Sequence, residues 1–211
     1  MVSCRNSGDM MPAVILTYIR WIDAMNRFIG RIAMYLIFAL VGVLLWSSIS
    51  KTFFTPSLWT LETAQFVMVA YYVIGGPYSI QLGSNVRMDL FYGDWSAKRK
   101  AQVDAVTVLF LLFYLGVLFY GAVGSTAYSL GYFGTEPFVF FGELAGAFLT
   151  GGAEAAGAKL GYLERSSTAW RPHIWPIKLL LCFGVLLMLL QVVAELFRDL
   201  ARLRGVSIDV A

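Results

Sequence analysis

Charged residues are scarce in this sequence. Only 14% of its 211 residues are Asp, Glu, Lys or Arg, whereas soluble domains carry about 25%. Hydrophobic residues make up 59% of the chain, and they gather into long uncharged runs. A soluble globular protein is therefore excluded, and we expect lipid to be the solvent for most of the chain.

Cysteine and histidine are also nearly absent. Cys4 and Cys182 lie far apart and form no CxxC pair, which excludes thiol exchange and a cysteine metal site. The single histidine, His173, cannot supply the paired axial ligands of a membrane cytochrome. Because the sequence offers no activated nucleophile, metal cluster or redox pair, we predict a non-catalytic protein without a cofactor or a bound metal.

The few charges divide the sequence into four apolar intervals: residues 32–50, 63–86, 105–135 and 179–194. A helix that crosses a bilayer needs about 20 apolar residues, and each interval reaches or approaches that length. We therefore predict an all-α membrane protein with four transmembrane helices, at about residues 31–51, 59–82, 103–130 and 174–197.

Lys and Arg are unequally divided between the two sides of these spans. Eleven lie in the N-terminal segment, the second loop and the C-terminal segment, and five lie in the two other loops and at their edges. The positive-inside rule then predicts that both termini are cytoplasmic. The net charge of +3 follows from this topology and indicates no nucleic-acid partner.

The N-terminal 30 residues predict a cytoplasmic tail and an amphipathic helix on the inner membrane surface, leading into the first span. At about 100° per residue, one face carries Tyr18, Ile22, Met25 and Ile29, and the opposite face carries Arg20, Asp23, Arg27 and Arg31. Docking onto a partner subunit and simple anchoring in the interface are both open for this helix.

The outer loop, residues 131–173, contains a second short apolar segment. Phe138–Leu149 is apolar apart from Glu143 and follows Pro137. Twelve helical residues are about 18 Å long, which is too short to cross a bilayer. We predict a short helix or re-entrant segment on the outer face, followed by a flexible or weakly helical connector over residues 151–159.

Glu62 is the acid that needs an explanation. The second span is predicted to begin after Ser57, a plausible N-cap, so Glu62 falls within its first two turns. A carboxylate in a membrane helix is a candidate ion or proton site, but one near a helix N-terminus also complements the helix dipole. We favour a structural or inter-subunit contact over a transported-ion site.

Three further patterns concern packing. Gly75-Gly76-Pro77 predicts a kink in the second span. Small residues recur every four positions in the third span, which predicts a helix packing face at Gly121, Ser125 and Ser129. At the end of the fourth span, helical spacing allows mutual pairing at a solvated helix end among Glu195, Arg198, Asp199 and Arg202.

The order of these features resembles the small membrane subunit of TRAP (tripartite ATP-independent periplasmic) transporters, the DctQ family. The resemblance covers roughly residues 25–204 and rests on motifs in a fixed order: Trp59-Thr60-Leu61-Glu62, Gly75-Gly76-Pro77-Tyr78, Asn85-Val86-Arg87-Met88-Asp89-Leu90-Phe91-Tyr92, the run from Glu164 to Lys178, and Leu189-Leu190-Gln191. The later motifs resemble the mannitol/chloroaromatic branch. Two features depart from the pattern: Asn85 stands where many relatives have His, and residues 135–163 look like an insertion.

The resemblance implies a place in the bacterial inner membrane beside a large DctM-like subunit and a periplasmic DctP-like solute-binding protein. It implies a scaffold that stabilises the elevator-type large subunit and helps dock the binding protein during Na⁺-coupled uptake of an organic acid. The candidate partner-interface residues are Trp59, Glu62, Gly75, Gly76, Pro77, Arg87, Asp89, Gly121, Ser125, Ser129, Arg165, Trp170, Trp175 and Gln191.

This interpretation divides the chain into a cytoplasmic N-terminal part (residues 1–30), a membrane domain (residues 31–204) and a cytoplasmic tail (residues 205–211). The alternative is a small autonomous exporter in which Glu62 couples transport to protons. The sequence lacks the paired discontinuous helices and midplane polar cluster of a self-sufficient transporter, which favours the scaffold.

Overall fold

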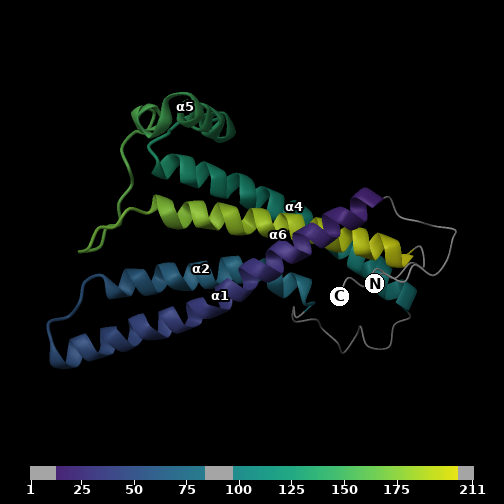
Figure 1. The fold of residues 1–211 in the computed structure, drawn as a ribbon, viewed down its shortest axis with the longest axis horizontal. Helices are drawn as coiled ribbons and strands as arrows, with labels where there is room; N and C mark the ends of the chain where they lie inside the picture. Colours follow the sequence, from purple (N-terminus) through teal and green to yellow (C-terminus); the bar gives the residue numbers. More distant parts are fainter. Residues whose placement is uncertain (1–12, 84–96, 204–211) are drawn as a thin grey trace.

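The computed structural model describes residues 13–83 and 97–203, and this part of the chain contains five helices. They are α1 (Ala13–Phe53), α2 (Thr60–Gln81), α4 (Ala97–Ser129), α5 (Pro137–Ala158) and α6 (Trp175–Leu203). In Figure 1 α1 pairs with α2 and α4 pairs with α6, and α5 lies beside the end of α4 from which the chain leads into α5. The prediction of an all-α membrane fold is confirmed.

Three helices are long and apolar enough to cross a membrane: α1, residues 102–129 of α4, and α6. They correspond to the first, third and fourth predicted spans. The second predicted span, α2, is not among them. Its apolar residues are interrupted by Glu62, Gln65, Pro77 and Gln81, so an interval with few charges is not uniformly hydrophobic.

α1 is one continuous helix of 41 residues. At 1.5 Å per residue it is about 60 Å long, about twice the hydrocarbon thickness of a bilayer. The predicted interfacial helix is therefore the first part of the same helix that contains the predicted span. The predicted polar face is wrong for Asp23, which is buried beside Ile22 and Asn26, because α6 supplies polar partners there.

α6 is the central helix and contacts α1, α2 and α4. Its approach to α2 depends on two glycines. A Cβ at Gly184 would overlap Val73, including the backbone of Val73, and a Cβ at Gly76 would overlap the end of the Met188 side chain. The absence of side chains at these two positions lets the helices lie close together, as is common in lipid. Pro77 is buried inside α2, and the helix continues beyond it to Gln81.

Only part of the packing face predicted at Gly121, Ser125 and Ser129 is buried among the described residues. Gly121 and Ser125 are exposed, and only Ser129 is buried. The buried residues of this part of α4 are Ala122, Val123, Thr126, Ala127, Ser129 and Leu130. Positions spaced exactly four apart drift by about 40° per step on a helix with 3.6 residues per turn, so the stripe rotates away from α6.

Two helix ends also differ from expectation. α2 begins at Thr60 with Trp59 as its N-cap residue and without a side-chain cap, and Ser57 bonds to the Thr60 hydroxyl at 3.0 Å instead of capping the backbone. α5 confirms the short outer helix but continues to Ala158 through a break at Gly152, whose φ is 73° and ψ is −163°. Residues 153–158 are thus helical, which agrees with the helical one of the two alternatives predicted for this connector.

Candidate functional site

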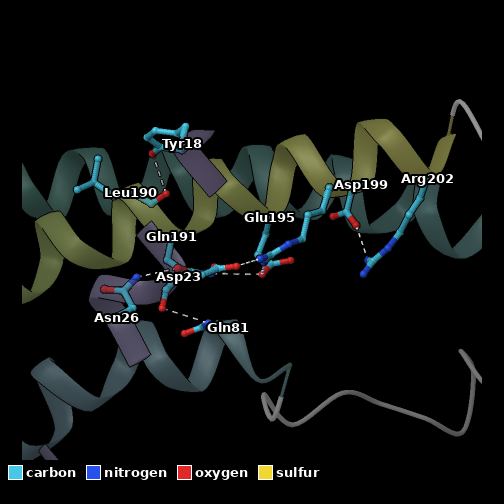
Figure 2. A network of polar contacts seen from close by, with 10 residues as sticks. Tyr18, Asp23, Asn26, Gln81, Leu190, Gln191, Glu195, Asp199 and Arg202 are labelled. Atoms are coloured by element: carbon cyan, nitrogen blue, oxygen red, sulfur yellow. Dashed lines mark hydrogen bonds and ion pairs between the residues drawn. The ribbon is translucent and has the colours of Figure 1, made fainter. Parts of the chain in front are cut away.

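Asp23 of α1 and Arg198 of α6 form a buried ion pair. The side chain of Asp23 is 2% exposed and that of Arg198 is 10% exposed. Arg198 also pairs with Glu195, one turn earlier in α6. Figure 2 shows Asp23 and Glu195 close together where α1 crosses α6. We call Asp23, Asn26, Gln191, Glu195 and Arg198 the inner network.

Gln191 is the hydrogen-bonding centre of the inner network. Its side-chain oxygen accepts from Asn26 Nδ2 at 2.7 Å, and its Nε2 donates to Asp23 Oδ1 at 3.2 Å. Gln191 and Asn26 are both essentially inaccessible to solvent. An amide suits this position because it can accept from one partner and donate to another at the same time.

Contacts around the inner network extend it to a third helix. Gln81 Nε2 of α2 donates to the backbone carbonyl of Asp23 at 3.3 Å. The Tyr18 hydroxyl donates to the backbone carbonyl of Leu190 at 2.9 Å. The ends of α1, α2 and α6 that lie on this side of the bundle are therefore joined by directional bonds as well as by apolar packing (Figure 2).

The pairing predicted at the end of α6 is confirmed, since Arg198 pairs with Glu195 and Arg202 pairs with Asp199 at 2.9 Å. The prediction that these residues form a solvated helix end is wrong. Arg198 and Asp199 are buried, because α1 extends past this part of α6. Buried charges need partners to offset their lost hydration, and the inner network supplies them.

A second polar cluster lies at the other end of the bundle. Glu62 is 4% exposed, and its Oε1 accepts from the Ser166 hydroxyl at 3.0 Å. Its Oε2 is buried without a hydrogen-bond partner among the described residues. Ser166 belongs to the segment between α5 and α6, so this bond connects the outer loop to the first turn of α2.

Lys178 and Glu164 complete this outer cluster. Lys178 Nζ donates to Glu164 Oε2 at 2.6 Å and to the backbone carbonyl of Ser125 at 3.3 Å. The Glu164 amide donates to the Ser129 carbonyl at 3.0 Å, and the Ile174 amide donates to the Glu164 carbonyl at 3.2 Å. The loop is thereby fixed on the outer ends of α4 and α6.

The outer face of this loop is cationic and aromatic. Arg165, Trp170 and Arg171 are exposed, whereas the nearby acids Glu62 and Glu164 are occupied by Ser166 and Lys178. No ion pair within residues 13–83 and 97–203 involves Arg165 or Arg171. Arg171 has a φ of 50° and precedes Pro172, a position where an extended backbone is preferred. Such strain is concentrated at functional sites.

The structure disperses the predicted interface residues over several environments. Glu62 bonds to Ser166, the residue after Arg165 in the outer loop. Trp59 and Trp170 are exposed, and Trp175 packs on the apolar cluster around Phe140. Gly75 has open space around it, whereas Gly76, Pro77 and Gln191 are used inside the chain. Arg87 and Asp89 lie outside the described residues.

Sequence reasoning missed the partners of these residues: Asp23, Asn26, Ser166 and Lys178. One signal was available for the inner network. Gln191, Glu195 and Arg198 recur at helical spacing in an otherwise apolar span, and a polar stripe in a membrane helix needs a polar partner. The sequence does not indicate that α1 supplies it.

Comparison with known families gives one result. Residues 40–140 match the model of the family described as tripartite ATP-independent periplasmic transporters, DctQ component. The matched segment contains α2, α4, the last third of α1 and the start of α5, but not the rest of α1 or α6. No curated protein and no solved structure matches the chain.

Proposed function

We propose that the chain is a DctQ component, the small transmembrane subunit of a TRAP transporter, because residues 40–140 match the model of that family, and that it is the stationary scaffold of the complex. It holds the large elevator-type membrane subunit in place and helps to dock the periplasmic binding protein during Na⁺-coupled uptake of an organic acid. The substrate and the ion are handled by the large subunit, and this chain carries out no chemistry.

One observation supports the scaffold most strongly: polar contacts join the helices at both ends of the bundle. The inner network joins α1, α2 and α6, and the outer cluster joins the outer loop to α2, α4 and α6. Relative helix movement would break buried charged contacts, which is strongly unfavourable. A body braced at both ends suits a subunit that stays fixed while its partner moves.

Exposed apolar surface offers the large subunit a place to bind. On α4 this surface includes Phe110, Phe113 and Val117, next to the exposed small residues Gly121 and Ser125. Small residues permit close approach of helix backbones in lipid. We assign Gly121 and Ser125 to contact with the large subunit, with lipid covering the rest of the apolar surface.

We also propose that α2 is a fourth membrane crossing and that both termini are cytoplasmic. α2 runs between the outer end of α1 and the end of the bundle where α4 begins, and it packs against α1 and α6 (Figure 1). Its neighbours shield two of its polar residues, since Thr60 and Glu62 are buried. The excess of Lys and Arg on the termini side supports this orientation.

The outer loop is then periplasmic, and its face with Arg165, Trp170 and Arg171 is the docking surface that we propose for the binding protein. The neighbouring acids Glu62 and Glu164 are used inside the chain, so the exposed charge of the segment between α5 and α6 is positive. An acidic patch on the binding protein would complement it and accelerate encounter.

The alternative, a proton-coupled exporter using Glu62, is supported by one observation, the unpartnered Oε2 of this buried carboxylate. Glu62 lies in the first turn of α2 and bonds to the outer loop, however, and not in the middle of the bundle. This position suits a structural contact between α2 and the outer loop better than a proton-coupling site, which must be reached from both sides of the membrane.

Affinity purification in mild detergent tests the proposed function. The tagged chain should recover a second, much larger membrane protein in a fixed ratio. A chain in which Arg165 and Arg171 are both alanine should recover the same protein equally well, because those residues face the periplasm. Recovery of the chain only as a monomer or homodimer would contradict the scaffold and favour the exporter.

A further inference from the structure

α5 is a helical hairpin and not a straight rod. Glu143 in its first arm and Lys159 at its end form an ion pair of 2.7 Å, although sixteen residues of straight helix would span about 24 Å. The chain turns at Gly152, where φ is 73°. The first arm comprises residues 137–151 and the second arm comprises residues 153–158.

The start of the first arm lies deeper than the charged groups of the outer cluster. The Phe138 ring lies 6.2 Å from the Phe119 ring and 6.0 Å from the Tyr120 ring, centroid to centroid. These α4 residues are five and six positions inside Ser125, whose carbonyl accepts from the Lys178 ammonium. At 1.5 Å per residue that is a depth of about 7.5–9 Å, so Phe138 is level with the membrane-spanning part of α4.

The sides of the first arm have different characters. One side packs on α4 and the outer loop through Phe140, which is buried, and through Phe141 and Leu144. The side that bears Glu143 faces Lys159 at the end of the second arm. A remaining side is apolar and uncovered, with exposures of 49% at Phe138, 52% at Val139, 58% at Phe148 and 83% at Leu149.

This apolar side is continuous with the exposed surface of a membrane span. Phe138 contacts Tyr120, which is itself 57% exposed on α4. Figure 1 shows α5 alongside the outer part of α4 and not beyond its end. Glu154 of the second arm is exposed, so the second arm must remain near water while the first arm can enter lipid.

We propose that the first arm of α5 lies in the outer leaflet, at the boundary between headgroups and acyl chains, with Phe138, Val139, Phe148 and Leu149 against the acyl chains. The Glu143–Lys159 pair and Glu154 lie among the headgroups, as in interfacial amphipathic helices. The hairpin anchors the outer loop at a fixed height, because the Gly161 amide at its exit donates to the Leu130 carbonyl of the α4 end at 3.0 Å.

Spin-label accessibility tests this proposal. The full-length chain, with any subunit that co-purifies, would carry Cys4→Ser and Cys182→Ala and be placed in lipid nanodiscs with a single label. Labels would be introduced at Leu149 and, independently, at Phe148. Matched controls would be labels at Glu154 and at Ser167, an exposed position in the outer loop. Collision rates with oxygen and with a water-soluble nickel chelate would be measured at each position.

The proposal predicts an oxygen-to-nickel ratio several-fold higher at Leu149 and Phe148 than at Glu154 and Ser167, because oxygen concentrates in lipid and the chelate does not enter it. Nickel access at Leu149 equal to that at Ser167 would place the arm in water and overturn the proposal. Protection of Leu149 and Phe148 from both reagents would also overturn it, because another protein surface would then cover the arm. Neither outcome bears on whether the chain is a scaffold.

Discussion

Asp23 and Arg198 form a buried ion pair between α1 and α6, although they are 175 positions apart in the sequence. The pair lies where α1 crosses α6, and both residues bond to further members of the inner network. The pair joins the first described helix to the last one. It can therefore form only after both α1 and α6 have been inserted into the membrane.

Removal of one member of this pair should destabilise the protein strongly. Arg198→Met alone leaves the buried carboxylate of Asp23 without its cation, at a cost of about 3–5 kcal/mol, whereas Asp23→Leu leaves Arg198 paired with Glu195 and should cost less. The double variant should recover part of the loss caused by Arg198→Met, because Asp23 no longer lacks its cation, although Glu195 still does. Thermal unfolding of the purified protein in detergent would measure this coupling.

The control for this cycle is the exposed pair Glu143–Lys159. Lys159→Met should change stability by less than about 1 kcal/mol, as is typical of solvated ion pairs. Equal costs for the buried and exposed single variants, or simple additivity in the double variant, would show that the Asp23–Arg198 contact does not brace the helices.

Substitution of Gly184 should disturb the contact between α2 and α6. Gly184→Ala places a Cβ against the Val73 side chain and backbone, and overpacking of this kind costs about 1–3 kcal/mol. Gly116→Ala in α4 is the matched control, because nothing lies near the added Cβ there, and it should be neutral or stabilising. Unfolding temperatures that fall equally for both variants would contradict the close approach at Gly184.

Glu62→Gln should leave Na⁺-dependent uptake largely intact in the reconstituted complex. Glutamine can still accept from the Ser166 hydroxyl, which preserves the contact seen at 3.0 Å. Uptake measured over a series of Na⁺ concentrations would show an unchanged dependence if Glu62 is a brace. Loss of the dependence with normal assembly would instead identify Glu62 as part of an ion path.

Arg165→Ala with Arg171→Ala should slow association with the binding protein and reduce its dependence on salt. Exposed charges at the rim of an interface act mainly on the association rate, and their effect is screened by salt. Association measured by surface plasmon resonance would show this against Lys51→Ala, an exposed cation elsewhere at the outer end. An equal loss in the Lys51 control would mean that general positive charge, and not this loop face, attracts the partner.

The sequence predicts where the helices lie along the chain better than it predicts which helices pack against one another. An uncharged interval directly indicates a membrane helix, so α1, α4 and α6 were predictable from the positions of Arg31, Lys51, Asp104 and Lys178. The uninterrupted length of α1 was not predictable, because its first part is stabilised by α6 and not by its own pattern. Asp23 looked solvated for the same reason: its partner, Arg198, is distant in the sequence.

The outer cluster shows the same limit. Glu62 stands out in the sequence as an acid without a local partner, and the structure confirms that its partner is not local. Ser166 contacts it only because the loop after α5 is fixed on α4 and α6 by Glu164 and Lys178. The spacing of small residues at Gly121 and Ser125 predicted a packing face but not its partner, since spacing alone does not say which helix lies opposite.

The central claim, that this chain remains a rigid body during transport, is tested most directly by one distance measurement. Spin labels at Val14 in α1 and Tyr162 in the outer loop, both 78% exposed, would report the length of the bundle in the complete transporter. Pulsed dipolar spectroscopy should give the same distance distribution with and without Na⁺ and substrate. A distribution that shifts beyond its own width between these states would contradict the scaffold and make this chain a moving part.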